Sequence, residues 1–332
     1  MYILRKLSKL IIVSHTKRYF CTDLSKFKPP YKVLFFGTDQ FSLESLKALT
    51  IECRKKVIID RLEVVTTFKS KPNKIYSFSA QENIILHQWP LTNEINGFDL
   101  GLVVSFGYLI PEKIINSFPL GMLNVHASLL PRWRGAAPII YALANGDAKT
   151  GVSIMKVKPK HFDIGEILNQ AEIEISSDTT QVNLYKNLSE LGAKTLIETL
   201  YNLHKLKAQK QSEIGVTNAP KIKSNFANVI FNKMIAIDVY NLSRALDGLY
   251  PLNTKCGNLP IKLYNVKLCS YKNNSIVPGG VVYDKKDKTL KIMCSDHNFI
   301  SVKSLGIVNK KIMNAEEFNN GYLRKIPNKL FC

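Results

Sequence analysis

The sequence predicts an α/β fold in which a Rossmann-like domain with a parallel-type sheet is followed by a small, OB-like β-barrel. Its 332 residues suffice for two domains, and an apolar content of 45% is typical of a globular protein. Apolar runs alternate with helical segments over residues 31–206, whereas short runs separated by turns follow from residue 223. The polar residues 207–222, with Gly and Pro, predict a linker.

The first domain begins with a strand and a helix. The run YKVLFFG (31–37) is continuously apolar, as expected of a strand covered on both faces, and 41–55 is a helix that Asp39 or Ser42 can cap. The alternation continues with a strand at 61–68, a helix at 77–88, a strand at 98–107, a short helix at 111–118, a strand with its loop at 121–130 and a long helix at 178–207. The first turn, FFGTDQF, lacks a dinucleotide fingerprint, so NAD is not expected.

The second domain, residues 223–332, is predicted to be a small antiparallel barrel. Its strand-like runs lie at 259–271, 279–284, 289–295 and 299–308. From Lys221 to the end there are 18 Lys or Arg against 7 Asp or Glu, a net charge of about +11. Such a barrel can follow a phosphate backbone, although any one cluster of lysines is equally explained as a solvated turn.

The whole chain is basic, with 46 Lys or Arg against 26 Asp or Glu and a formal charge of +20. This excess favours a polyanionic partner, either nucleic acid or an anionic membrane, although a basic compartment would also account for it. The six cysteines show no zinc-binding or disulfide spacing, so we expect no metal and a reducing compartment. No apolar stretch approaches the roughly 20 residues that cross a bilayer, so we expect a soluble protein without membrane insertion. We also expect a monomer.

The amino terminus, residues 1–30, is predicted to be a mitochondrial presequence and tether. It carries five basic residues and no acidic residue before Asp23. Its apolar and basic side chains separate on a helical wheel, which is typical of import into the mitochondrial matrix. The alternative is a basic arm that binds nucleic acid or a lipid surface.

The run LNVHASLL places Asn124 and His126 at the end of a strand. Side chains alternate along a strand with period 2, so both residues point to the same face and can converge on one oxygen. Donors aimed at an oxygen that becomes negative are what acyl transfer requires. A polar strand end that satisfies its own backbone is the alternative.

A carboxylate further along supports the catalytic interpretation. Asp163, in KPKHFDIGEIL, lies at a tight turn, from which it could orient His126. Ser128 would complete a Ser-His-Asp hydrolase, but the chain has no G-x-S-x-G elbow and Ser128 shares one strand and loop with the histidine. We therefore do not expect a serine hydrolase.

Four segments, in order, resemble the folate-dependent formyltransferases: VLFFGTDQFSLESLKAL, VVSFGYLIPEKII, LNVHASLLPRWRGAAPI and HFDIGEIL. The unbroken SLLPRWRGAAPI is similar to members that act on methionyl-tRNA. The resemblance implies that residues 31–206 form the catalytic domain and that the barrel binds tRNA. It implies 10-formyltetrahydrofolate as formyl donor and methionyl-tRNA as acceptor.

The resemblance also implies residue roles. Asn124, His126 and Asp163 match the catalytic group of the family, although this chain has DIG where the family usually has DTG. Folate contacts are implied for two runs, namely Phe106, Gly107, Tyr108 and Leu109, and Ser128, Leu129, Leu130 and Pro131. Phe106 and Tyr108 could equally be core residues.

Candidate tRNA contacts are the basic residues Lys69, Lys71, Lys74, Arg132, Arg134, Lys285, Lys286 and Lys288. The two arginines are equally explained as structural supports. The family usually has a longer basic loop where this chain has only KSKPNK (69–74). Two other functions remain open: a folate-dependent formyltransferase or hydrolase acting on a small molecule, and a non-catalytic RNA-binding protein.

Overall fold

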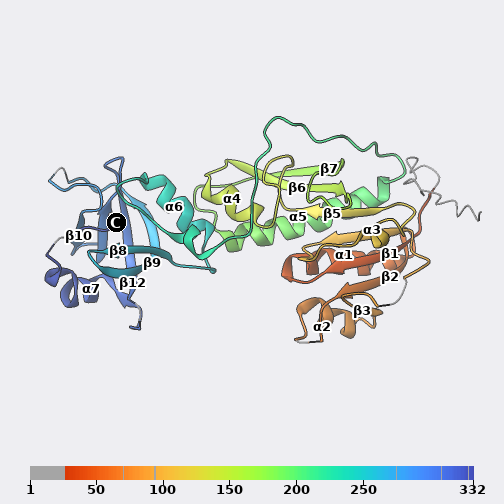
Figure 1. The fold of residues 1–332 in the computed structure, drawn as a ribbon, viewed down its shortest axis with the longest axis horizontal. Helices are drawn as coiled ribbons and strands as arrows, with labels where there is room; N and C mark the ends of the chain where they lie inside the picture. The colour runs from red at the N-terminus through yellow and green to blue at the C-terminus, as the bar shows by residue number, and fades with distance from the viewer. Residues whose placement is uncertain (1–26, 70, 93–94, 274, 308, 328) are drawn as a thin grey trace, which may run out of the picture.

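A computed structural model describes residues 27–69, 71–92, 95–273, 275–307, 309–327 and 329–332. Two bodies, each built on one sheet, follow each other along the long axis of the molecule (Figure 1). The predicted presequence lies almost wholly outside the described residues. Among the helices of the described ranges, none is long and apolar enough to cross a membrane.

The first body is built on a seven-stranded sheet with the order β3-β2-β1-β4-β5-β6-β7. The strands that pair in parallel are β1 (Tyr31–Gly37), β2 (Ile59–Thr66), β3 (Leu86–Gln88), β4 (Leu100–Val104) and β5 (Met122–His126). The antiparallel pair β6 (Lys149–Lys156) and β7 (Ile167–Glu174) extends the sheet beyond β5. The mostly parallel sheet confirms the predicted fold class.

Both faces of this sheet are covered, which explains the continuous apolar run of β1. Val33 and Phe35 belong to the core under α1 (Gln40–Lys55) and α5 (Gln181–Asn202), whereas Leu34 and Phe36 belong to the smaller core of the opposite face. The remaining helices of this body are α2 (Lys74–Gln81), α3 (Glu112–Ile115) and α4 (Pro138–Ala144).

One local prediction was partly wrong. The expected helix at 77–88 ends at Gln81, because Asn83 adopts a positive φ of 55° and the chain continues as β3. The strands β6 and β7 were not foreseen at all. By contrast, Asp39 caps α1 as expected, and it forms a reciprocal capping box with Ser42.

The second body is an antiparallel sheet with the order β10-β11-β12-β9-β8, in which β13 pairs with β12. Its strands are β8 (Leu252–Cys256), β9 (Leu259–Cys269), β10 (Val281–Asp284), β11 (Thr289–Met293), β12 (Phe299–Ile307) and β13 (Met313–Asn314). Its helical segments are η2 (Ser224–Ala227), α6 (Ala236–Ala245), α7 (Ala315–Gly321) and η3 (Leu323–Lys325).

The carboxyl terminus links the two edges of this sheet. Lys255 of β8 exchanges backbone hydrogen bonds with Cys332 at 3.0 and 2.9 Å, and Phe331 donates to the carbonyl of Gly279, just before β10, at 2.8 Å. Phe331 is buried in the core of this body. The last residues thus bridge β8 and β10, which makes the sheet barrel-like, as predicted.

The two bodies touch through α4 and α6, which lie next to each other between the sheets (Figure 1). Arg244 of α6 is buried and donates to the carbonyls of Ser176 and Thr179, just before α5, at 3.2 and 3.1 Å. Tyr141 of α4 packs against Phe226, with ring centroids 5.1 Å apart. The barrel is therefore joined to the first body by contacts as well as by the linker.

Candidate active site

A cavity of about 550 Å³ opens where β1, β4 and β5 end. Its walls are contributed by five parts of the chain: the start of α1, residues 103–110 after β4, the end of β5, the segment 135–140, and residues 155–163. Gln181 and Tyr185 of α5 complete it. This is the edge at which an open α/β sheet places its ligands.

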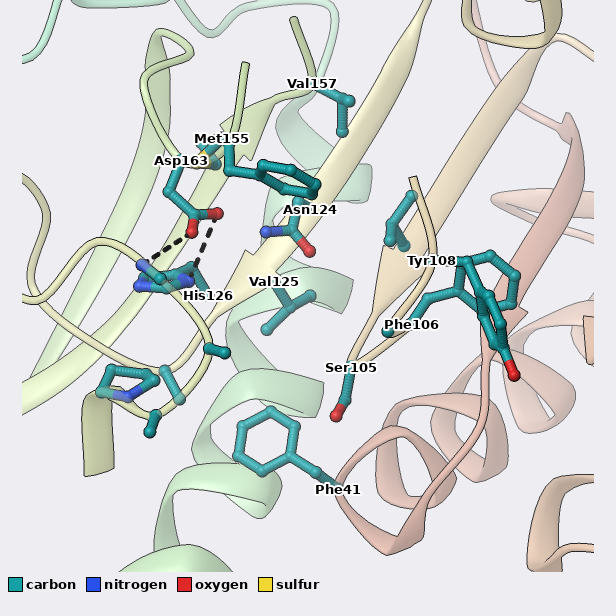
Figure 2. A pocket seen from close by; sticks show the side chains of 18 of the residues that line it. Phe41, Ser105, Phe106, Tyr108, Asn124, Val125, His126, Met155, Val157 and Asp163 are labelled. Atoms are coloured by element: carbon teal, nitrogen blue, oxygen red, sulfur yellow. Dashed lines mark hydrogen bonds and ion pairs between the residues drawn. The ribbon is translucent and has the colours of Figure 1, made fainter. Parts of the chain in front are cut away.

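The end of β5 directs two polar side chains into the cavity. Asn124 and His126 are two residues apart on this strand, so they share one face, and both line the cavity. Figure 2 shows both side chains near the carboxylate of Asp163. The predicted catalytic residues are therefore brought together.

His126 is held from both of its ring nitrogens. Its Nε2 lies 2.9 Å from the carbonyl oxygen of Trp133, and because a carbonyl only accepts, Nε2 carries a proton. Its Nδ1 lies 3.5 Å from Oδ1 of Asp163. The ring is only 6% exposed, so these partners fix its orientation and leave Nδ1 as the nitrogen on the carboxylate side.

Asp163 is fixed in turn by its backbone and by its second oxygen. Its φ is 55°, in the left-handed region that an aspartate adopts only when its surroundings hold it. Oδ2 accepts a hydrogen bond of 2.9 Å from the backbone N–H of Gly135. Gly135 itself has a φ of 124°, and a side chain there would collide with the carbonyl of Ala219.

The arginines of PRWRG have protein partners. Arg132 forms a two-point pair with Asp147 at 2.8 and 2.6 Å, and its guanidinium lies over the ring of Trp133. Trp133 donates from its indole to the same carboxylate at 2.7 Å. Burial by itself raises the pKa of Asp147, but the hydrogen bonds from Arg132, Trp133 and Asn145 lower it below its ordinary value.

Arg134 is bound by the linker. Its Nε and Nη2 donate to Oε1 of Gln211 at 3.0 and 2.7 Å. Its backbone pairs with Thr217 and Ala219 at 2.9 and 2.7 Å. Both arginines thus match the structural alternative, and their contact with tRNA stays a prediction.

Residues 87–200 match a family model described as formyl transferase, and residues 221–323 match one described as formyl transferase, C-terminal domain. The chain is 38% identical over 310 residues to the mitochondrial methionyl-tRNA formyltransferase of Homo sapiens, covering 89% of this chain and 79% of the relative. The chain belongs to the methionyl-tRNA formyltransferase family. This confirms the resemblance found in the sequence.

Two further similarities define the breadth of the match. The methionyl-tRNA formyltransferase of Fusobacterium nucleatum is 32% identical over 314 residues, which cover 90% of this chain and 99% of the relative. Among solved structures, a sugar 3N-formyl transferase in the presence of dTdp and 5-N-formyl-THF has a TM-score of 0.63 at 19% identity. The match covers 86% of this chain and 100% of the solved chain. At this identity it shows a similar fold and nothing more.

One of the two runs expected to contact folate in this family member reaches the cavity. Residues 106–109 line it, with Tyr108 and Leu109 exposed at 46% and 58%. Phe106 also packs edge-on against Phe36 and Trp89, with centroids 5.5 and 5.2 Å apart. Phe106 therefore both lines the cavity and packs against buried aromatic rings, and its contact with folate stays a prediction.

The other run does not line the cavity. Ser128 is fully buried, and its hydroxyl donates to the carbonyl of Arg132 at 2.6 Å. Leu130 is buried too, and its N–H donates to Ser153 at 3.0 Å. Ser128, Leu129, Leu130 and Pro131 are therefore not among the residues that line the cavity, and their contact with folate stays a prediction.

The candidate lysines are exposed. Lys69, Lys71 and Lys74 lie in the loop before α2 and at its start. Lys285, Lys286 and Lys288 form the turn between β10 and β11, where Asp284 accepts from the N–H of Lys286 at 2.9 Å. In Figure 1, β10 lies on the side of the barrel away from the first body.

Sequence reasoning missed a second polar group in the cavity. Ser105 donates to Oδ2 of Asp39 at 2.6 Å, and Tyr185 lies beside the same carboxylate. Burial, and then the negative charge of Asp39, raise the pKa of Tyr185. Asp39 was identified only as a cap, and no local signal brings Tyr185 to it.

Within the described residues, no cluster of His, Cys, Asp and Glu is arranged to hold a metal.

Proposed function

We propose that this protein transfers the formyl group of 10-formyltetrahydrofolate to the amino group of methionyl-tRNA, giving formylmethionyl-tRNA for the initiation of mitochondrial translation. The observation that carries the proposal is the convergence of Asn124, His126 and Asp163 in one cavity. The relatives named as methionyl-tRNA formyltransferases match this chain over 79% and 99% of their own lengths, and their names support methionyl-tRNA as the substrate.

The chemistry follows from the geometry. The methionyl nitrogen attacks the formyl carbon, whose oxygen becomes negative as a tetrahedral centre forms. The side-chain amide of Asn124 donates to that oxygen. His126, whose Nε2–H is bound to the carbonyl of Trp133, takes part through Nδ1 in the proton transfer. The C–N bond to N10 then breaks, and the carbonyl is restored on the methionyl nitrogen.

One proton must move from the attacking nitrogen to N10. The pair formed by Nδ1 of His126 and the carboxylate of Asp163 receives it and returns it to the leaving nitrogen. An α-amino group has a reference pKa of about 7.7 to 8.0, so a large neutral fraction is present near pH 7.5 to 8. The site therefore needs no strong base, only one that is correctly placed.

The folate is proposed to lie against residues 106–109, where the backbone and two exposed apolar side chains line the cavity. Solved structures of similar fold are described with folate compounds, including one with folinic acid. Those descriptions support a folate-derived donor of the formyl group.

The tRNA is proposed to contact the basic barrel and the lysines of the loop before α2. The barrel carries about half of the positive excess of the chain. Contacts between its basic side chains and phosphates would position the tRNA without touching the reacting carbon. We further propose that the protein acts as a monomer in the mitochondrial matrix. Fusion of residues 1–30 to a reporter tests the address: import is expected, and a cytosolic reporter would contradict it.

The proposal is tested by offering the purified protein 10-formyltetrahydrofolate with four acceptors in parallel: methionyl-tRNA, uncharged tRNA, free methionine and an amino-sugar nucleotide. Formylation of methionyl-tRNA alone supports it. Formylation of the amino-sugar nucleotide, or release of formate without an acceptor, would assign the protein to the small-molecule alternative instead. Tight tRNA binding without any transfer would leave only an RNA-binding protein.

A further inference from the structure

The linker contributes a side chain to the support of the active site. Gln211 is separated from Asp163 by 48 residues, yet its Nε2 donates to the carbonyl oxygens of both Asp163 and Gly165 at 2.8 Å. Its Oε1 accepts from two nitrogens of Arg134. Because carbonyls only accept and a guanidinium only donates, these four bonds fix the orientation of the amide.

The two loops that Gln211 joins are the ones that hold His126. The loop of Asp163 supplies the carboxylate near Nδ1, and the loop of Arg134 supplies the carbonyl of Trp133 on Nε2. The same second loop supplies the N–H of Gly135 that binds the Asp163 carboxylate. One amide from the linker thus ties together every group that orients the imidazole.

The surrounding linker is fixed to the first body at several points. Gln209 exchanges backbone hydrogen bonds of 2.8 Å with Ile167 of β7, and Thr217 and Ala219 pair with the backbone of Arg134. The segment predicted as a linker is therefore attached to the first body on both sides of Gln211. A side chain held in this way can hold others in place.

We propose that Gln211 is a positioning residue for formyl transfer, which acts by holding Asp163 at its distance from His126. The backbone of Asp163 is in the left-handed region and Gly165 packs directly on the carbonyl of Lys156, so this turn depends on outside contacts. Gln211 supplies two of them. This inference rests on the proposed function, since it assigns a role within that reaction.

The test compares Gln211→Ala with Gln209→Ala in the full-length protein. Gln209 lies in the same linker and is exposed, and its hydrogen bonds use the backbone alone, so it is a matched control. We expect Gln211→Ala to lower kcat by about 10- to 100-fold, the loss that follows from misplacing a catalytic group by up to about 1 Å, with both KM values nearly unchanged. Gln209→Ala should retain full activity.

A double-mutant cycle separates positioning from general damage. If Gln211 acts through Asp163, Gln211→Ala should add little to the loss already caused by Asp163→Ala in single-turnover assays. Full additivity of the two losses, a change confined to KM, or normal kcat in Gln211→Ala would overturn the proposal.

Two further measurements cover other failures. Gln211→Glu serves if Gln211→Ala does not fold. Glutamate has the same size, but it places a carboxylate oxygen instead of the donating NH₂ group against two carbonyls, so kcat should fall as well. Normal kcat in Gln211→Glu would overturn the proposal. If the wild-type chain transfers no formyl group, the proposed function fails, but the clamp is still testable. Backbone amide exchange at Gly135 should then accelerate in Gln211→Ala and not in Gln209→Ala; equal exchange would refute it.

Discussion

Replacing Asp163 by Asn tests the charge of the catalytic pair without changing its shape. In the wild type, Oδ2 accepts from the N–H of Gly135, so an asparagine must place its oxygen there and turn its NH₂ toward His126. Nδ1 of His126 then accepts a hydrogen bond while Nε2 still donates to Trp133. The variant should keep the geometry and remove the negative charge beside the imidazole.

The size of the effect follows from the separation. When His126 has taken up the transferred proton, its positive charge and the Asp163 carboxylate, 3.5 Å apart, attract by about 5 kcal/mol at an effective dielectric constant of about 20. Desolvation of the two largely buried groups offsets part of this. A net loss of about 2 to 4 kcal/mol in the transition state corresponds to a fall of roughly 30- to 1,000-fold in kcat.

The assay is single-turnover formylation of methionyl-tRNA, with folate affinity and thermal stability measured in parallel. Asp60→Asn is the control, because it removes the same charge from a half-exposed side chain. Asp60 lies at the start of β2, on the edge of the sheet opposite the cavity, so its loss should leave kcat unchanged. A folded Asp163→Asn protein with wild-type kcat would refute the electrostatic role of this carboxylate.

Three other predictions concern separate parts of the molecule. Asn124→Ala should lose about 2 to 4 kcal/mol of transition-state stabilisation in kcat, and an effect on KM alone would assign Asn124 to binding. Asp147→Asn should lower the free energy of unfolding by about 1.5 to 3 kcal/mol at neutral pH by denaturant titration. The lowered pKa of Asp147 means that this contribution is present above its ordinary value of 3.8 and is lost as pH falls below it, so wild type and variant should converge in acid; a constant gap would contradict this. Substituting Lys285, Lys286 and Lys288 by Gln should reduce the dependence of log tRNA affinity on log salt by about 0.7 to 0.9 per phosphate contact, whereas an unchanged slope would show a solvated turn.

Much of the first body could be predicted because its signals are local. A continuous apolar run identifies β1, and the period of a strand is enough to bring Asn124 and His126 to one face. The family resemblance then connects Asp163 to them. The helix expected at 77–88 ends early because Asn83 adopts a positive φ, and asparagine allows that conformation without requiring it.

The remaining features depend on contacts between distant residues. Nothing near Arg132 in the sequence indicates Asp147 as its partner, so a basic loop of this kind suggests phosphate binding until the fold places a carboxylate beside it. Gln211 lies in a polar segment with the composition of a tether, and its role follows only from carbonyls 46 and 48 residues away. Closure of the barrel by Phe331 is of the same kind.

The most direct test of the central claim follows the formyl carbon itself. The full-length protein is given 10-formyltetrahydrofolate labelled with ¹³C at the formyl group together with methionyl-tRNA, and the aminoacyl group is released and weighed by mass spectrometry. We predict labelled formylmethionine with the wild-type protein and a loss of at least about 100-fold in rate with folded His126→Ala, as removal of a group that stabilises the transition state requires. Absence of label on methionine with the wild type, or undiminished labelling by the variant, would contradict the account.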